Sequence, residues 1–196
     1  MKKLVIGIGA LVLLVVVGAM VFLPRFVPVE RKLVINTSPE RVYPHLVNLE
    51  EWQKWNPWGA KDPGMKISYG DKKEGEGASY SWVSESQGSG SMTISKAVEP
   101  TRLETDLDFG AQGKAKAHFE LKSVPENQTE VIWHMDADMG NNPVGRIFGT
   151  QMDAMIGPDF EDGLNRLKEL SESEASSEAA TARPVTEATP QPTTTP

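Results

Sequence analysis

The stretch that decides the fold is Gly157-Pro-Asp-Phe-Glu-Asp-Gly-Leu-Asn-Arg-Leu-Lys-Glu-Leu170, in the last quarter of the chain. Together with the residues before it, this stretch carries large apolar side chains at steps of mostly three and four, the spacing of one face of an α-helix. They are Val144, Phe148, Met152, Met155, Ile156, Phe160, Leu164, Leu167 and Leu170. An apolar stripe of this kind must be buried, so the pattern predicts a helix from Val144 to Leu170 that covers a sheet. Pro158 lacks an N–H and crowds a preceding carbonyl, so we expect a kink there, eased by Gly157.

The charges of this helix follow the helix dipole. Asp159, Glu161 and Asp162 precede Arg166 and Lys168, and Asp162 and Arg166 form an acid-before-base pair one turn apart. We expect these side chains to form a solvated face, because charged residues are mostly exposed.

Length and composition narrow the class of protein. The chain has 196 residues, a formal net charge of -7 and no cysteine. Residues 29–170 form one domain of ordinary size, about 140 residues. Without a basic stripe, nucleic acid is not an expected partner. The lack of cysteine excludes disulfides, thiolate metal ligands and cysteine nucleophiles.

The first residues predict a membrane anchor. After a short flank, residues 1–3, the segment from Leu4 to Leu23 has no charged residue. At ~1.5 Å per residue it is long enough to cross ~30 Å of hydrocarbon. We therefore expect an uncleaved transmembrane helix over residues 4–23, followed by a linker over residues 24–28. The alternative is a cleaved signal peptide, which usually has a shorter apolar run and an Ala-x-Ala site that is not evident here.

Flanking charges give a direction to this anchor. Lys2 and Lys3 favour a cytoplasmic N-terminus, which would place the domain on the outer, periplasmic or extracytoplasmic, side. Arg25, Arg31 and Lys32 on the other flank weaken this bias.

The central part of the chain predicts an antiparallel sheet. Ser38-Pro39 begins a short helix to Val47, and a second short helix is expected from Leu49 to Trp55. Elsewhere apolar and polar residues alternate in segments separated by turn residues. These predicted strands are Val29–Asn36, Met65–Tyr69, Gly77–Ser84, Gly90–Val98, Arg102–Phe109, Gly113–Val124 and Thr129–Asp138. The short connections predict an α+β fold with a meander of about six to seven strands, dry on the side that the long helix covers.

The end of the chain differs from the domain in composition. Residues 171–196 are rich in Ser, Glu, Ala, Thr and Pro, and Val185 is the one large apolar residue among them. Such a segment buries too little surface to offset the entropy of ordering, so we expect a disordered tail.

Several motifs in this order resemble the START-like helix-grip (SRPBCC) superfamily, and within it the polyketide cyclase/dehydrase and lipid-transport-like group, as a membrane-anchored member. The motifs are Ser38-Pro-Glu-Arg-Val-Tyr, Leu49-Glu-Glu-Trp-Gln-Lys-Trp-Asn-Pro-Trp, the stretch Gly75 to Trp82, Thr129-Glu-Val-Ile-Trp-His-Met and Gly157-Pro-Asp-Phe-Glu-Asp-Gly-Leu-Asn-Arg-Leu-Lys. The resemblance implies a curved antiparallel sheet that grips the C-terminal helix, with an apolar cavity between them. It does not imply one chemistry, because this fold hosts binders, transporters and enzymes.

The residues that face the predicted helix are the candidate ligand-binding set. Aromatic and methionine side chains offer large and adaptable contact area to an apolar guest. The set is Tyr80, Trp82, Met92, Phe109, Phe119, Trp133, Met135, Phe148, Met152 and Met155. Trp52, Trp55 and Trp58 either rim the mouth of the cavity or pin the short helices to the sheet, and the sequence favours neither reading.

No catalytic or metal-binding motif stands out, and no cofactor is implied. His45, His118 and His134 have no serine or carboxylate at a recognisable spacing, and we expect them on the surface. The preferred hypothesis is a membrane-tethered binding module for a hydrophobic or lipid-like small molecule. A cyclase or dehydratase enzyme using the same cavity is the second hypothesis, with Tyr80 and Thr105 as its inward polar groups. A protein-interaction module using the tryptophan-bearing helices is the third.

Overall fold

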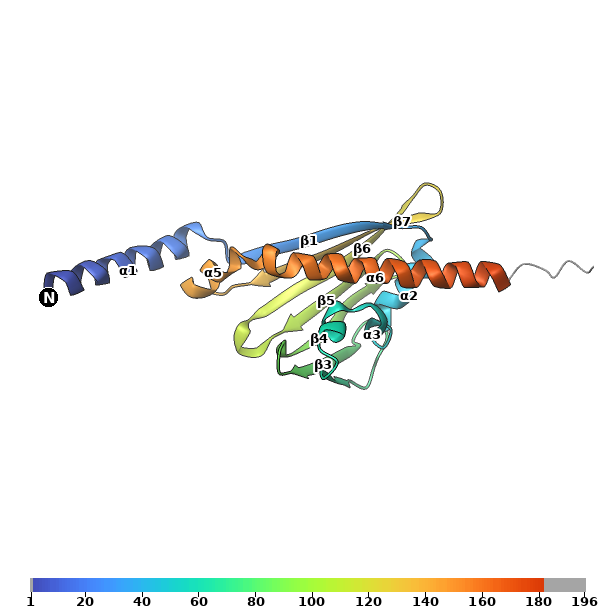
Figure 1. The fold of residues 1–196 in the computed structure, drawn as a ribbon, viewed down its shortest axis with the longest axis horizontal. Helices are drawn as coiled ribbons and strands as arrows, with labels where there is room; N and C mark the ends of the chain where they lie inside the picture. The colour runs from blue at the N-terminus through green and yellow to red at the C-terminus, as the bar shows by residue number, and fades with distance from the viewer. Residues whose placement is uncertain (1, 182–196) are drawn as a thin grey trace, which may run out of the picture.

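The computed structural model describes residues 2–181 of the chain. A long N-terminal helix is followed by a sheet that is interrupted near its start by short helices, and two helices end the domain (Figure 1). The elements are α1 Lys2–Phe22, β1 Phe26–Ile35, α2 Pro39–Val47, α3 Trp52–Trp55, α4 Pro57–Lys61, β2 Lys66–Tyr69, β3 Ser79–Ser84, β4 Gly88–Val98, β5 Arg102–Asp108, the 3-10 turn η1 Gly110–Gln112, β6 Lys114–Val124, β7 Gln128–Asp138, α5 Pro143–Gly149 and α6 Met152–Thr181.

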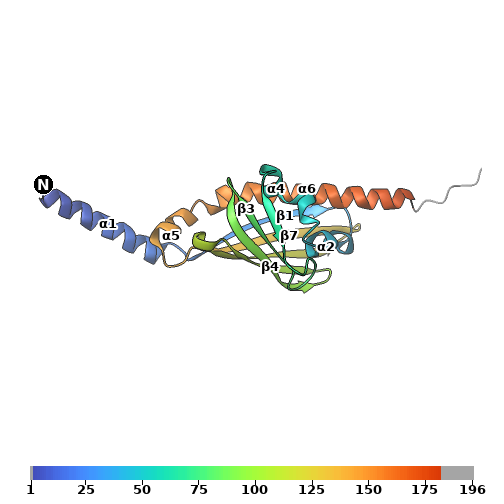
Figure 2. The same cartoon turned by 90° about the horizontal axis from the view of Figure 1, so that it is seen from below.

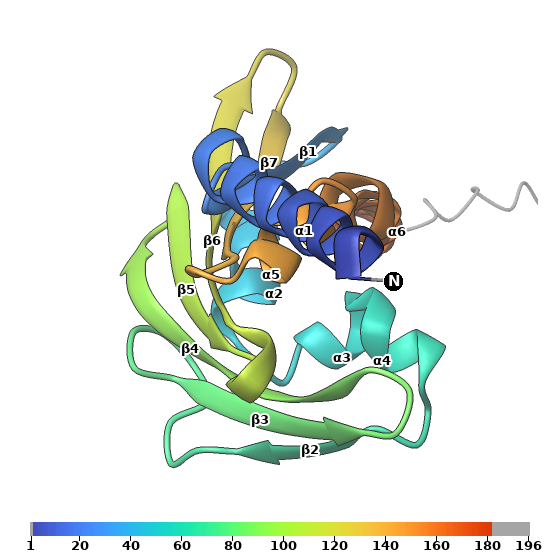
Figure 3. The ribbon, with the colours of Figure 1, turned by 90° about the vertical axis from the view of Figure 1, so that its left-hand side faces the viewer.

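The strands form one antiparallel sheet, as the alternating sequence predicts. Its seven strands follow the order β1-β7-β6-β5-β4-β3-β2, so β1 crosses over to pair with β7 and the others form a meander. Seen end-on, the sheet curves round from β1 to β2, with α6 along its concave side and α3 and α4 between α6 and β3 (Figure 3). The predicted α+β helix-grip fold is therefore confirmed.

The short helices differ from the prediction at one point. Helix α2 has the predicted bounds, but two short helices follow it instead of one. Asn56 ends α3 and also begins α4, since its side-chain oxygen accepts a hydrogen bond from the Trp58 N–H at 2.9 Å and Pro57 occupies the first turn. The sequence predicts an end at Trp55, but Asn is also a favoured helix N-cap and Pro a favoured first residue, so Asn56-Pro57 begins a further helix.

The predicted helix from Val144 to Leu170 is two helices, and the break is not at Pro158. Helix α6 continues through Pro158, while α5 ends at Gly149. A Cβ atom on Gly149 would lie 2.9 Å from Val27 Cγ2 and 3.0 Å from Met139 Cγ, so this glycine allows the chain to pass close to β1. The close approach turns α5 away from the axis of α6, and the sequence pattern gives no sign of it (Figure 2).

Helix α6 also continues past Leu170, the predicted start of the disordered tail, to Thr181. Side chains of this extension bind the body of the domain: Glu172 accepts a hydrogen bond from the Asn36 N–H at 2.7 Å, and Glu178 pairs with Arg41 at 2.5 Å. Ser171 is buried. Ion pairs and hydrogen bonds thus order a segment whose low apolar content predicts disorder. The rest of the predicted tail lies outside the described residues.

Helix α1 projects from the domain beyond the sheet (Figure 1). By length and composition, it is the one helix of residues 2–181 that could cross a membrane. Most of its described side chains are exposed, but Ala19 in the last turn is buried at the contact with α5. The domain therefore contacts the C-terminal end of α1, while most other described side chains of this helix are exposed.

Candidate functional site

The space between sheet and α6 has two halves that differ in their side chains. The half beneath α3 and α4 is filled by rings, and we call it the aromatic half: Trp55, Phe119, Trp133 and Phe160. Trp133 stacks on Phe160 with 4.0 Å between ring centroids, and Phe119 stacks on Trp133 at 4.9 Å. A Cβ atom on Gly163 would lie 2.8 Å from Trp133 Cζ3, so the helix backbone itself touches the indole. This half is a packed core.

Two of the tryptophans predicted as mouth residues are part of this packing. Trp52 and Trp55 are buried, and their indole N–H groups donate to backbone oxygens of α2, Trp52 to Leu46 at 2.8 Å and Trp55 to His45 at 3.0 Å. Trp58 is half-buried, with its ring 5.8 Å from that of Trp133. The arrangement favours the reading in which these residues pin the short helices to the sheet. It also removes the exposed aromatic patch that a protein-interaction module would need.

The other half lies toward α5, and small residues line it. We call it the alanine half, after Ala115, Ala117 and Ala137 on the inner face of β6 and β7. Ala115 lies opposite Ala137, and Ala117 opposite Met135, in the register of these strands. These residues and Met135 keep 4–7% of their surface exposed, whereas Phe119 keeps none. Here the inner face carries small apolar side chains, and among residues 2–181 no stacked ring pair involves these positions.

Most of the predicted ligand-binding residues lie on or beside the inner face of the sheet, in one half or the other. Tyr80, Trp82, Met92, Phe119, Trp133 and Met135 are buried, and Phe109 and Met152 are half-buried and pack against the core. The Trp82 ring lies across Gly90, where a Cβ atom would be 2.5 Å from Cζ2, and meets Phe109 at 5.8 Å between centroids. Trp82 and Phe109 therefore border the alanine half from the β3–β5 side.

Phe148 and Met155 do not lie where the helical stripe predicts. Phe148 is 50% exposed and Met155 51% exposed, so neither lines the interior. The stripe assumed one continuous helix, but the break after Gly149 separates α5 from α6 and directs α5 toward α1. Both side chains belong to the outer surface at this end of the domain.

Two of the buried polar groups lie on the inner face of the sheet. Thr105 and Tyr80 face inward and are buried, as the strand alternation predicts. Burial raises the pKa of the Tyr80 phenol, so the neutral hydroxyl can donate or accept a hydrogen bond but does not ionise at neutral pH.

Two hollows of the described surface are lined mainly by polar residues. The larger, about 300 Å³, is lined by polar residues of α2, α3 and the end of α6. The second, about 180 Å³, lies beside Thr105 and Ala117, where the register of β4 shifts between Ile94 and Lys96. Neither is the apolar cavity that the family resemblance implies. The rings of the aromatic half occupy part of that space.

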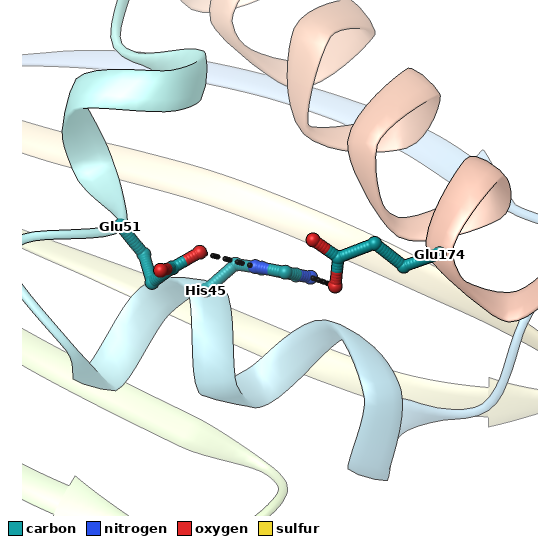
Figure 4. A group of neighbouring side chains, drawn as sticks. All are labelled: His45, Glu51 and Glu174. Carbon is teal, nitrogen blue, oxygen red and sulfur yellow. Dashed lines mark hydrogen bonds and ion pairs between the residues drawn. The ribbon is translucent and has the colours of Figure 1, made fainter. Parts of the chain in front are cut away.

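Three titratable groups converge at the larger hollow (Figure 4). His45 is buried, its Nδ1 lies 3.2 Å from Glu51 Oε2, and its Nε2 lies 3.3 Å from Glu174 Oε2. Ligand atoms of the three residues lie within 4.8 Å of one another, a grouping able to hold a metal ion. Lys54 Nζ also binds Glu51, at 2.7 Å. Each group thus already has a polar partner within the protein, and the cluster joins α2, α3 and the extension of α6.

The prediction that His45 lies on the surface is therefore wrong, and the sequence did contain a signal. Arg41 and His45 are four residues apart on α2, and Glu174 and Glu178 are four residues apart in the extension of α6. Such pairs occupy one helix face, so two antiparallel helices can match them, Arg41 with Glu178 and His45 with Glu174. This pairing cannot be predicted as long as residues 171–181 are expected to be disordered.

Solved structures place this fold among known ones. A protein of unknown function from Staphylococcus aureus superposes with a TM-score of 0.59 at 15% identity, covering 77% of this chain and 96% of that one. A protein from Nitrosospira multiformis gives 0.56 at 17% identity, covering 76% and 99%. The di-domain ARO/CYC protein StfQ of the steffimycin biosynthetic pathway gives 0.57 at 9% identity, covering 77% of this chain and 52% of that one. At these identities the likeness concerns the fold alone.

The sequence comparison is more specific. No curated protein matches the chain. Residues 27–172, which include the sheet and most of α6, match the family model described as polyketide cyclase / dehydrase and lipid transport. This span is most of the chain and coincides with the sheet and the helix that it grips. The chain therefore belongs to the polyketide cyclase / dehydrase and lipid transport family.

Proposed function

We propose that this protein is a membrane-tethered binding module that holds a hydrophobic or lipid-like small molecule against the alanine half. The observation that carries the proposal is the contrast inside the grip, where rings fill one half while the small apolar side chains of Ala115, Ala117 and Ala137 line the other. Family membership supports a small-molecule guest at this interface.

Movement of neighbouring side chains would enlarge the alanine half when a guest binds. Met139 and Met152 pack against the core beside the α5–α6 junction and are half-buried, so they can change rotamer at little cost. Burying ~200 Å² of apolar guest surface yields about 5 kcal/mol, and association costs consume much of it. A guest of lipid size therefore suits the site better than a small fragment.

The tether in this proposal is α1. It is apolar from Leu4 onward, and its described side chains are exposed except near its last turn. The charges that follow it are engaged within the domain: Arg25 pairs with Asp138 at 2.7 Å, and Arg31 with Glu161 at 2.6 Å. Lys2 and Lys3 are the first residues of the helix, and on this basis we place the N-terminus in the cytoplasm and the domain on the outer side.

An experiment on the full chain tests the guest. The purified protein is analysed by native mass spectrometry and lipid extraction beside the variant Ala117→Leu, which fills the alanine half, and the control Ala60→Leu on exposed α4. An apolar molecule should accompany the wild type and Ala60→Leu but not Ala117→Leu, with equal circular dichroism for all three. A wild type free of any apolar molecule, or equal recovery from Ala117→Leu, contradicts the proposal.

A further inference from the structure

An apolar surface without a protein partner lies at the end of the domain next to α1. Val144 is 70% exposed, Ile147 45%, Phe148 50% and Met155 51%. The first three belong to α5 and the last to the first turn of α6. We call these four residues the α5 surface. Among the described residues, they are the large apolar side chains of α5 and α6 that face solvent to this extent.

The contacts between α5 and α1 fix the position of this surface along the tether. Ala19 is buried against the domain, and the Arg146 guanidinium donates from Nη1 to the carbonyl oxygens of Met20, at 2.7 Å, and Leu23, at 3.1 Å. These carbonyls belong to the end of α1, where a helix leaves its acceptors unpaired. Helix α5 therefore sits beside the last turn of α1, as Figure 3 also shows.

The length of α1 determines how deep the α5 surface lies in the membrane. The 21 residues of α1 extend over about 31 Å, which matches the ~30 Å of hydrocarbon in a bilayer. When the helix spans the membrane, its last turn lies where acyl chains meet headgroups, and α5 lies at the same level. Partial burial of apolar side chains at that boundary is the arrangement of interfacial helices.

From this geometry we infer that the α5 surface is a lipid-docking surface, inserted into the acyl–headgroup boundary of the membrane that α1 spans. The inference rests on the proposed tether. The occupant is the apolar part of the lipid rather than an anionic headgroup, because the nearby bases are already engaged: Arg146 binds backbone oxygens and Arg25 binds Asp138. Insertion is accordingly expected to change little between neutral and anionic lipid.

The α5 surface adjoins the proposed binding site. Gly149, at the end of α5, packs on Val27, which pairs with Ala137 of the alanine half. Docking would therefore bring the alanine half close to the membrane.

The absence of cysteine from the chain makes the test direct. Single variants Phe148→Cys, Leu13→Cys in α1 and Ser123→Cys in the distant β6–β7 hairpin are labelled with the fluorophore NBD. Each full-length protein is reconstituted in phosphatidylcholine vesicles that carry a doxyl quencher at a shallow or a deep acyl position. The Leu13 label should be quenched most by deep doxyl and the Phe148 label most by shallow doxyl, at least about threefold more than the Ser123 label.

The outcomes separate the tether from the docking. If the label at position 13 is quenched while the label at position 148 is quenched as weakly as that at position 123, the inference is overturned. The proposed tether is supported in that case. An unquenched Leu13 label rejects the tether and the docking together. Blue-shifted emission at position 148 without doxyl quenching would mean that a second copy of the chain covers the surface, which also overturns the inference. Ile147→Cys repeats the measurement at a neighbouring position.

Discussion

The two halves of the grip differ in the side chains that lie between one sheet and one helix. In the aromatic half, Trp133 lies between Phe119 and Phe160, and helix and sheet touch through their rings. In the alanine half, the same strands present Ala115 and Ala137, and the helix side ends at the break after Gly149. The difference indicates that the two ends of the grip are packed in different ways.

The largest expected effect is a loss of stability in the aromatic half. Phe160→Ala removes a fully buried ring and should lower the free energy of unfolding by about 3–5 kcal/mol. Met152→Ala, beside the alanine half, should cost only about 1 kcal/mol, because its side chain is already partly exposed. Denaturant titration of both variants measures the two losses. Equal losses would mean that the halves do not differ in packing.

Two glycines of α6 provide a finer comparison. In the aromatic half, Gly163→Ala drives a methyl group into Trp133 and Pro57, with closest distances of 2.8 and 3.1 Å, and should destabilise by about 1–3 kcal/mol. In Gly157→Ala the new methyl meets the Arg31 guanidinium, which can move, and the gain in helix propensity of about 1 kcal/mol offsets the loss. Thermal unfolding should rank the two variants in this order, and the reverse order would refute the assignment.

The extension of α6 adds a smaller contribution at the aromatic end. Glu174→Gln weakens the contact with His45, so hydrogen exchange of the amides from 172 to 181 should accelerate up to about fivefold. Global stability should fall by less than about 1 kcal/mol, because Glu174 is half-exposed. Glu169→Gln, on an exposed face of the same helix, is the control and should leave exchange unchanged. Similar exchange in both variants would remove the proposed role of the cluster.

The smallest effect concerns pH and lies at the alanine end. A hydrogen bond from Arg25 lowers the pKa of Asp138 from 3.8 to about 2. Because the folded-state pKa is depressed, the pair contributes stability above about pH 4 and loses it as the pH falls toward 2. Carboxyl NMR titration should find this low value in the wild type and a pKa near 4 in Arg25→Gln. An Asp138 pKa that stays near 2 in the variant would show that Arg25 is not the cause.

Local patterns were sufficient to predict the sheet and the elements around it. Alternation assigned the inner face correctly from Tyr80 to Met135, and the bounds of α2 followed from Ser38-Pro39. The predicted pair of Asp162 and Arg166 is present at 2.9 Å, because it depends on helix spacing alone. Glu161 is predicted to be solvated but forms an ion pair with Arg31. The Arg31 guanidinium lies over Gly157, between two turns of the helix, and this brings it within reach of Glu161.

The structural features that the sequence does not predict depend on contacts between distant segments. The break after Gly149 follows from its approach to Val27, and the helix beyond Leu170 depends on Asn36, Arg41 and His45. Whether rings fill a cavity or line it is likewise a matter of packing, because Trp133 has the same alternation in either case. The division into halves therefore becomes visible only in three dimensions.

Quenching of tryptophan fluorescence by a brominated fatty acid tests the binding role of the alanine half most directly. Trp82 borders that half, whereas Trp52, Trp55, Trp58 and Trp133 pack around the other. Titration of the full chain in nanodiscs should quench part of the emission saturably, and Trp82→Phe should abolish that part. Emission that the fatty acid leaves unchanged, or saturable quenching that persists in Trp82→Phe, would contradict binding at the alanine half.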